Sequence, residues 1–180
     1  MKSLVIPAIA KSVQKSGVWV AGIMLLLILS ACSNNNEPDV SAVAANSATK
    51  LEVYKSPTCG CCKDWVDHME DDGFQTLVHH PADLSGVKQQ YGISSEHQSC
   101  HTAISEEGYV FEGHVPSELV KRFLENPPKG AAGLAVPGMP IGSPGMEMGD
   151  RVDQYSVFIL YKDGRSEHFA EVKGVEVLDD

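Results

Sequence analysis

The sequence is short of basic residues and has no apolar run of comfortable membrane-spanning length. Over 180 residues, 14 lysines and arginines stand against 24 aspartates and glutamates, a formal net charge of −10. An acidic surface repels a phosphate backbone, so the composition argues against nucleic acid as a partner. The most apolar stretch, Gly17 to Ala31, falls short of the roughly 20 residues that a membrane helix needs.

The first 31 residues instead have the layout of a secretory signal peptide. Lys2, Lys11 and Lys15 precede the apolar stretch, whose length suits the core of such a signal. It ends in Leu29-Ser30-Ala31-Cys32, which resembles a lipobox, a signal in which the cysteine is acylated and becomes the first mature residue. The alternative is a free cysteine behind an uncleaved signal anchor.

Lipidation at Cys32 predicts an exported protein held in the membrane by acyl chains such as palmitate, at about 0.8 kcal/mol per buried methylene. Ser33 resembles the sorting pattern for the periplasmic face of the outer membrane. Residues 32–50 are rich in Asn, Ala and Ser and predict a flexible tether. The rest, 51–180, is long enough to build one domain with a core that does not depend on disulfides. Cleavage removes three lysines and leaves a mature net charge of −13.

Strands and helices alternate along this domain. Hydrophobic periodicity and turn residues predict strands at 51–54, 74–79, 102–111 (with a Glu-Glu-Gly turn), 155–161 and 166–172, and helices at 62–69, 83–91 and 116–124. This order predicts an α/β, thioredoxin-like domain, with a central mixed sheet flanked by helices and a right-handed crossover between its first two strands. We expect Ser117 to cap the third helix. A Gly/Pro/Met-rich insertion covers 130–149, where Pro137, or else Pro140, is the candidate for the cis-proline that thioredoxins place against their cysteine pair.

Four cysteines remain after lipidation, and three of them are crowded into Cys59-Gly60-Cys61-Cys62, with Cys100 elsewhere. An even number could form two disulfides, although the adjacent Cys61 and Cys62 suit ordinary bridges poorly. Cys59 and Cys62 have redox spacing at a helix start, which favours thiolates. A third thiol would disturb a dithiol switch but suits a soft metal, so the cluster predicts one or more bridged Cu(I) ions. Zinc is less favoured, because its sites usually space cysteines in separated pairs.

Other candidate ligands lie near Cys100 and in the insertion. His101 adds an imidazole, and Met146 and Met148 add thioethers, with Met139 close by; the alternative for the methionines is core filling. We interpret the remaining histidines as structural or solvated. His114 is expected to be a turn or capping residue, with metal binding as its second interpretation, and His68 is expected on an exposed helix face. At most one of the adjacent His79 and His80 can face a site, and no pattern around His97 or His168 indicates a function.

Four motifs together resemble the CopG-like family of periplasmic, thioredoxin-like metal-binding proteins. They are residues 54–62 (YKSPTCGCC), 99–102 (SCHT), 112–116 (EGHVP) and 133–148 (GLAVPGMPIGSPGMEM). The resemblance covers nearly the whole mature domain and implies a link to copper handling and resistance. The lipobox is not part of the family pattern.

Three functions remain open. The first is an envelope lipoprotein that sequesters or relays Cu(I). Its thiolate ligands would be Cys59, Cys61, Cys62 and Cys100, and His101, Met146 and Met148 would complete the site. Its partners would be the membrane, copper ions and other copper-handling proteins. The second is a thiol-disulfide or copper oxidoreductase in which Cys59 or Cys62 attacks and Cys100 resolves. The third is an interaction module built around structural zinc.

Overall fold

The cysteine-rich helix belongs to a strand-helix-strand unit at one edge of a mixed sheet. The computed structural model describes residues 48–178, so the predicted signal peptide, Cys32 and most of the predicted tether lie outside the described residues. The helices are α1 (Gly60–Asp71), α2 (Leu84–Gln90), α3 (Ser117–Glu125) and the short 3₁₀ turn η2 (Ser95–His97). The strands are β1 (Lys50–Lys55), β2 (Gln75–His79), β3 (His101–Ser105), β4 (Val110–Glu112), β5 (Ala131–Ala135), β6 (Gln154–Tyr161), β7 (Ser166–Lys173) and β8 (Glu176–Leu178).

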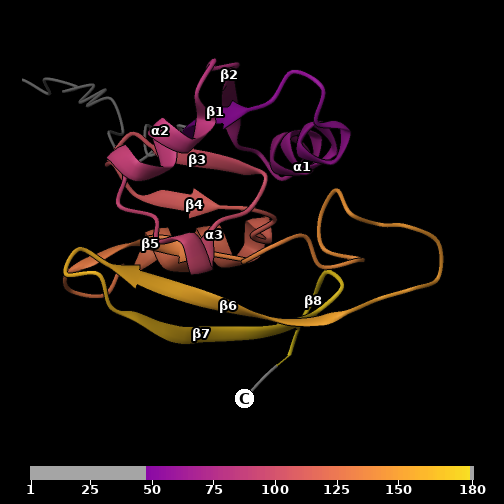
Figure 1. Cartoon of the computed structure of the whole chain (residues 1–180). Helices are drawn as coiled ribbons and strands as arrows, with labels where there is room; N and C mark the ends of the chain where they lie inside the picture. The colour runs from indigo at the N-terminus through magenta and orange to yellow at the C-terminus, as the bar shows by residue number, and fades with distance from the viewer. Residues whose placement is uncertain (1–47, 179–180) are drawn as a thin grey trace, which may run out of the picture. The chain divides into compact units, whose positions relative to one another are not determined.

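The eight strands lie in the order β2-β1-β3-β4-β5-β6-β7-β8 (Figure 1). β1 pairs in parallel with β2 and β4 with β5, and the other neighbours are antiparallel. The predicted α/β class and mixed sheet are therefore confirmed, whereas the likeness to thioredoxin stays a prediction. Among the described residues, no helix combines the length and apolarity that crossing a membrane requires.

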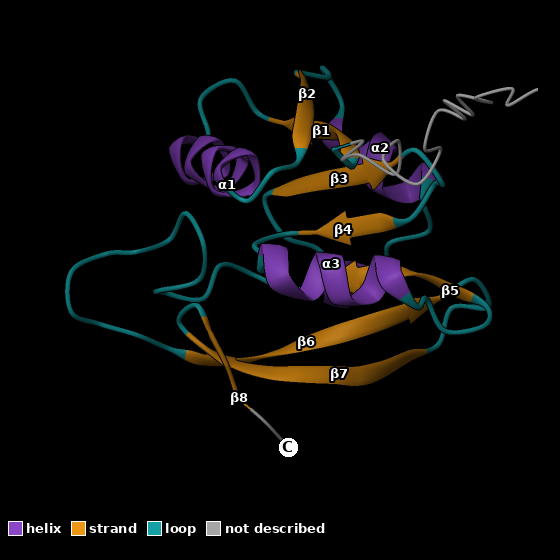
Figure 2. Cartoon of the chain, turned by 180° about the vertical axis from the view of Figure 1, so that it is seen from behind, coloured by secondary structure: helices purple, strands orange, loops and turns teal. Residues whose placement is uncertain are grey.

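The helices cover the two faces of the sheet unequally. On one face, α1 and α3 enclose the main core, which includes Trp65, Met69, Phe111, Leu119 and Phe123. On the other face, α2 lies over a smaller cluster formed by Ile93, Ile104 and Val110. Figure 1 shows α2 in front of the sheet, and Figure 2, seen from behind, shows α3 in front. The predicted buried face of the cysteine helix is confirmed, because Cys62, Trp65, Val66 and Met69 all point into the core.

Three predictions for the second half of the chain were wrong. The insertion at 130–149 contains β5, whose residues are almost all buried and so lack the alternation that marks a half-exposed strand. Pro116, rather than Ser117, is the N-cap residue of α3. The peptide bonds of the described residues are all trans, so neither Pro137 nor Pro140 is cis.

The position that faces the cysteine pair belongs to another residue. The hairpin beside β1 is β3–β4 rather than β6–β7, and the residue directly before β3 is Cys100. A thiol therefore stands where we expected the proline.

Candidate metal centre

The first turn of α1 gathers three sulfur atoms. Cys59 is the N-cap residue, and its Sγ accepts a hydrogen bond from the Cys62 backbone N–H at 3.3 Å. Cys59 and Cys62 form a disulfide, while the Cys61 Sγ lies 3.5 Å from the Cys59 Sγ. Cys62 is fully buried, whereas Cys59 and Cys61 are partly exposed. The local spacing thus puts one free thiol directly beside an oxidised pair.

Strand pairing brings Cys100 to this helix start. β1 and β3 are antiparallel with Lys55 opposite His101, so the end of β1 and the start of β3 meet at one edge. The Cys62 Sγ lies 3.7 Å from the Cys100 carbonyl oxygen. One ligand atom each from Cys59, Cys61, Cys62 and Cys100 lies within 4.8 Å of the others. We call these four residues the cysteine cluster.

A second group, which shares Cys100, contains two histidines. The Cys100 Sγ lies 3.1 Å from the His114 Nε2 and 3.4 Å from the His101 Nδ1, and ligand atoms of all three residues lie within 4.8 Å of one another. His114 Nδ1 donates to the Pro144 carbonyl at 2.7 Å. Because Nδ1 carries the proton, Nε2 presents a lone pair to the sulfur, the arrangement that metal-binding histidines usually have.

Burial sets the protonation of this group. Together with the nearby Cys61, burial raises the pKa of the Cys100 thiol to about 11, and burial is the larger cause. It also lowers the pKa of His114, and it lowers that of His101 to well below the usual range, with the neighbouring His114 contributing. Both imidazoles are therefore neutral at pH 7 and able to bind a metal, whereas Cys100 must release its proton when it becomes a ligand.

One buried atom of the group has no partner. His101 is completely buried, and its Nε2 is one of two buried side-chain polar atoms of the described residues without a hydrogen bond. Its ring lies against Trp65, at 4.4 Å between centroids, and Trp65 is held by its Nε1–H to the Val115 carbonyl at 2.9 Å. An unpaired polar atom in a core is costly. The sulfur and imidazole donors of the group fit a soft or borderline metal ion.

The loop after β5 rises toward α1 (Figure 1). A Cβ on Gly145, whose φ is +80°, would lie 2.5 Å from the Cys61 carbonyl oxygen and 2.6 Å from the Trp65 backbone nitrogen. The adjoining Pro144 supplies the acceptor for His114. Only glycine permits both this backbone conformation and this close approach.

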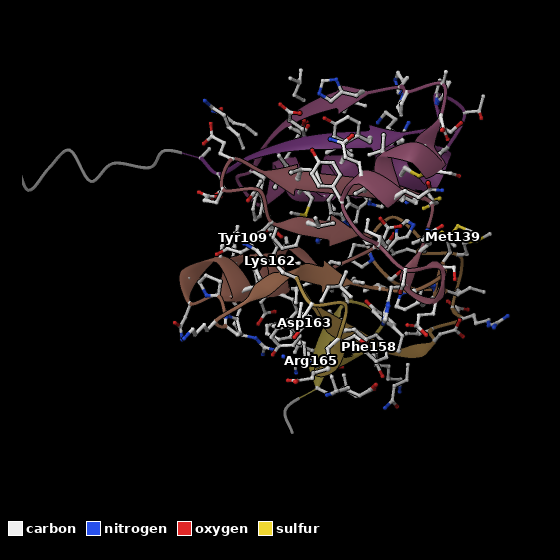
Figure 3. All side chains as sticks on the ribbon, turned by 60° about the vertical axis from the view of Figure 1, so that its left-hand side comes forward. Tyr109, Met139, Phe158, Lys162, Asp163 and Arg165 are labelled. Atoms are coloured by element: carbon white, nitrogen blue, oxygen red, sulfur yellow. A yellow bond between two sulfur atoms is a disulfide. The ribbon has the colours of Figure 1, made fainter. Side chains whose placement is uncertain are left out.

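The methionines of this loop differ in their exposure. Met146, which follows Gly145, is partly buried. Met148 is 64% exposed and Met139 is 52% exposed, and Figure 3 shows Met139 at the rim of the molecule. Met139 and Met148 therefore do not fill the core, which was the alternative interpretation. Neither side chain is enclosed in the way that a side chain bound to a buried metal ion would be.

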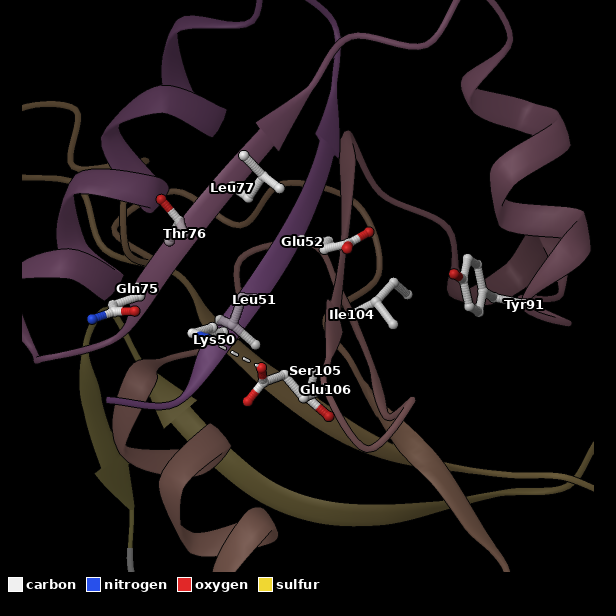
Figure 4. A pocket seen from close by; sticks show the side chains of 10 residues that line it. All are labelled: Lys50, Leu51, Glu52, Gln75, Thr76, Leu77, Tyr91, Ile104, Ser105 and Glu106. Carbon is white, nitrogen blue, oxygen red and sulfur yellow. Dashed lines mark ion pairs between the residues drawn. The ribbon is translucent and has the colours of Figure 1, made fainter. Parts of the chain in front are cut away.

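Two openings border the β1-α1-β2 unit. One, of about 360 Å³, is lined by Cys59 with Lys63, Val66, Val78 and His80 among its neighbours, so the disulfide is reachable from solvent at Cys59. The other, of about 440 Å³, lies at the far end of the strands beside an exposed Lys50–Glu106 ion pair of 3.4 Å (Figure 4). It is lined by neither cysteine nor histidine, and so its chemistry is unrelated to the metal centre.

Comparison with known proteins identifies the family. The family described as "Protein of unknown function, DUF411" matches residues 97–146. A solved structure named "Copper resistance protein copG- Form 2" is 42% identical, with a TM-score of 0.66, and the match covers 69% of this chain and 98% of that one. The chain belongs to the CopG family of copper resistance proteins. The corresponding Form 1 structure is 43% identical with a TM-score of 0.65 and the same coverage. No curated protein matches the chain.

The CopG-family fold brings together most of the predicted ligands and adds one. Cys59, Cys61, Cys62, Cys100 and His101 all belong to the two groups. His114, interpreted above first as a turn residue, belongs there too. The Glu106-Glu107-Gly108 turn is the local signal that this segment is a hairpin. The hairpin register pairs Thr102 with Glu112, so Cys100, two residues before Thr102, lies opposite His114, two residues after Glu112.

Two further histidines, His68 and His79, contact residues outside the metal centre. His68 was expected on an exposed face, but it is partly buried and its Nε2 accepts the Ser117 backbone N–H at 3.3 Å, at the start of α3. His79 stacks on Tyr54, with 4.9 Å between the ring centroids.

Proposed function

We propose that this CopG-family protein binds copper as Cu(I) at the cysteine cluster and sequesters or relays it in the cell envelope, contributing to copper resistance. The observation that carries the proposal is the pair of donor groups, four sulfurs and two imidazoles in all, joined at Cys100. Soft thiolates select Cu(I), and imidazole accepts it as well. The copper resistance proteins that the chain resembles support the same metal.

Sharing of Cys100 favours more than one ion. A thiolate can bridge two Cu(I) ions, and the Cys100 sulfur lies within reach of both the other three cysteines and His114. Full loading also requires reduction, because a disulfide sulfur has no thiolate to offer. Two electrons and two protons convert the Cys59–Cys62 disulfide into two thiols, which raises the number of free cluster thiols from two to four.

Copper titration tests the proposal. Reduced protein, handled without oxygen, should take up Cu(I) stoichiometrically and bind more of it than the disulfide form. Replacing both Cys61 and Cys62 by Ser should abolish most of the uptake, whereas Ser166→Ala on β7 should leave it unchanged. Uptake no greater than that of an unrelated control protein would sink the proposal. A redox-silent zinc ion held in stoichiometric amount would favour the zinc module instead.

The Cys59–Cys62 disulfide favours a second candidate, a thiol-disulfide or copper oxidoreductase. In the copper version, the dithiol gives two electrons to two Cu(II) ions and forms the disulfide, two Cu(I) ions and two protons. In the thiol version, an incoming thiolate attacks the Cys59 Sγ through the 360 Å³ opening, and the Cys62 thiolate leaves. Metal-free reduced protein that cannot reduce a small disulfide would exclude the thiol version.

The lipid anchor completes the proposal. We propose that Cys32, outside the described residues, is acylated and holds the protein at the periplasmic face of the outer membrane. Metabolic labelling with a palmitate analogue should mark the chain, and Cys32→Ala should lose the label and leave the membrane fraction. A labelled Cys32→Ala chain would contradict this assignment.

A further inference from the structure

A buried charged network lies on the opposite face of the sheet from α1, directly behind the metal centre. Glu112, at the end of β4, is completely buried, and Lys88 of α2 is 4% exposed. The Lys88 Nζ donates to the Glu112 Oε1 at 2.5 Å and to the Thr102 Oγ1 at 2.9 Å. The Thr102 hydroxyl in turn donates to the Glu112 Oε2 at 2.6 Å. Each charge of the pair is thus matched and hydrogen-bonded.

The network reaches the metal centre through one backbone group. The Ser99 N–H donates to the Glu112 Oε1 at 2.6 Å, and Ser99 directly precedes Cys100. Glu112 itself stands two residues before His114. One carboxylate therefore fixes the chain next to both members of the Cys100–His114 pair while touching neither side chain.

The same segment is fixed on its other side. The Ser99 Oγ donates to the Gly138 carbonyl, and the Gly138 N–H donates to the Gln98 carbonyl at 3.2 Å. Gly113, with φ of +73°, has no room for a Cβ, because Ser99 side-chain atoms would lie 2.6 Å away. Cys100 consequently enters the centre from a segment with little freedom to move.

We propose that Glu112 is a positioning residue of the metal centre: through the Ser99 N–H it holds the Cys100 sulfur against His114, and Lys88 and Thr102 keep its carboxylate in place. The benefit of this positioning for copper binding rests on the proposed function. The contacts that hold Cys100 in place are present without metal. A role in stability alone predicts something different, because replacing a buried ion pair by apolar residues is often neutral or stabilising.

A matched pair of double variants separates the two roles. Lys88→Met with Glu112→Gln removes both charges but keeps an oxygen that can accept the Ser99 N–H. Lys88→Met with Glu112→Leu removes both charges and the acceptor. We expect the Gln variant to bind Cu(I) within about threefold of the parent and the Leu variant to bind about 10- to 100-fold more weakly, as is usual when a group that orients a ligand is lost.

A metal-free readout uses the reactivity of the Cys100 thiol. In the full-length chain with the disulfide intact, alkylation of Cys100 is followed by mass spectrometry of its peptide. It should be several-fold faster in the Leu variant and unchanged in the Gln variant. Equal alkylation rates and equal affinities in the two variants would overturn the proposal, whatever their thermal stabilities.

Two further outcomes are decided in the same experiment. If the parent binds no copper, the proposed function fails, and the alkylation rates alone support or overturn the role of Glu112. If the double variants do not fold, Thr102→Val, which removes one donor to the carboxylate and keeps the side-chain shape, takes their place. Faster Cys100 alkylation in Thr102→Val supports the proposal, and an unchanged rate overturns it.

Discussion

His114 gives the sharpest test of the centre, because its two ring nitrogens have separable roles. Nδ1 donates to Pro144 at 2.7 Å, and Nε2 faces the Cys100 sulfur at 3.1 Å. In His114→Asn, the side-chain amide nitrogen lies near the position of Nδ1, while nothing replaces Nε2. His114→Ala removes both. The pair therefore distinguishes a metal ligand from a residue that only fastens the loop.

The expected magnitudes follow from these contacts. Loss of Nε2 should weaken Cu(I) binding at least 10- to 100-fold, or about 1.4 to 2.8 kcal/mol, in both variants. The free energy of unfolding should fall by about 1–3 kcal/mol more in His114→Ala than in His114→Asn, because only the alanine variant leaves the Pro144 carbonyl unpaired. His114 is completely buried, so solvent offers that carbonyl little compensation.

Competition with a chromophoric Cu(I) chelator, under reducing conditions without oxygen, measures the affinities, and urea unfolding of the metal-free chains measures stability. Parental copper affinity in His114→Asn, together with lost stability in His114→Ala, would refute the ligand role and restore the interpretation of His114 as a turn residue.

Three further predictions concern the loop and the protonation of the centre. Gly145→Ala should destabilise the metal-free protein by about 1–3 kcal/mol more than Gly138→Ala in urea unfolding, because both have positive φ but only Gly145 lacks room for a Cβ; equal losses would mean that the loop does not pack against α1. The free energy of unfolding should fall as pH drops below about 6.5, by at most about 1.4 kcal/mol per pH unit for each histidine, because the lowered pKa of His101 leaves the unfolded chain binding the extra proton; His101→Asn should flatten this slope, and an unchanged slope would speak against a buried neutral His101. Cu(I) affinity should rise between pH 6 and 8, because Cys100, with its pKa raised to about 11, releases a proton on binding; a chelator competition with equal affinity at both pH values would contradict this.

Local patterns predicted much of the fold. The face of α1 that carries Cys62, Trp65, Val66 and Met69 follows from helical spacing alone, and the β6–β7 hairpin follows from Asp163-Gly164 between alternating runs. β5 escaped prediction because a strand buried on both faces has no alternation. The expectation of a cis-proline failed for a related reason: it depended on which hairpin lies beside β1, and strand order is a long-range property.

The sequence by itself determined three of the four sulfurs of the centre, because Cys59, Cys61 and Cys62 lie within one turn at the start of a predicted helix. Tertiary structure decided the rest. Antiparallel pairing of β3 with β1 and β4 placed Cys100 against that turn and His114 against Cys100, and burial made the imidazoles neutral and Cys100 hard to ionise. The tertiary structure also shows that a disulfide joins Cys59 to Cys62 and that Cys61 is a free thiol. Spacing shows which donors share one turn, whereas strand register determines which distant donors meet them.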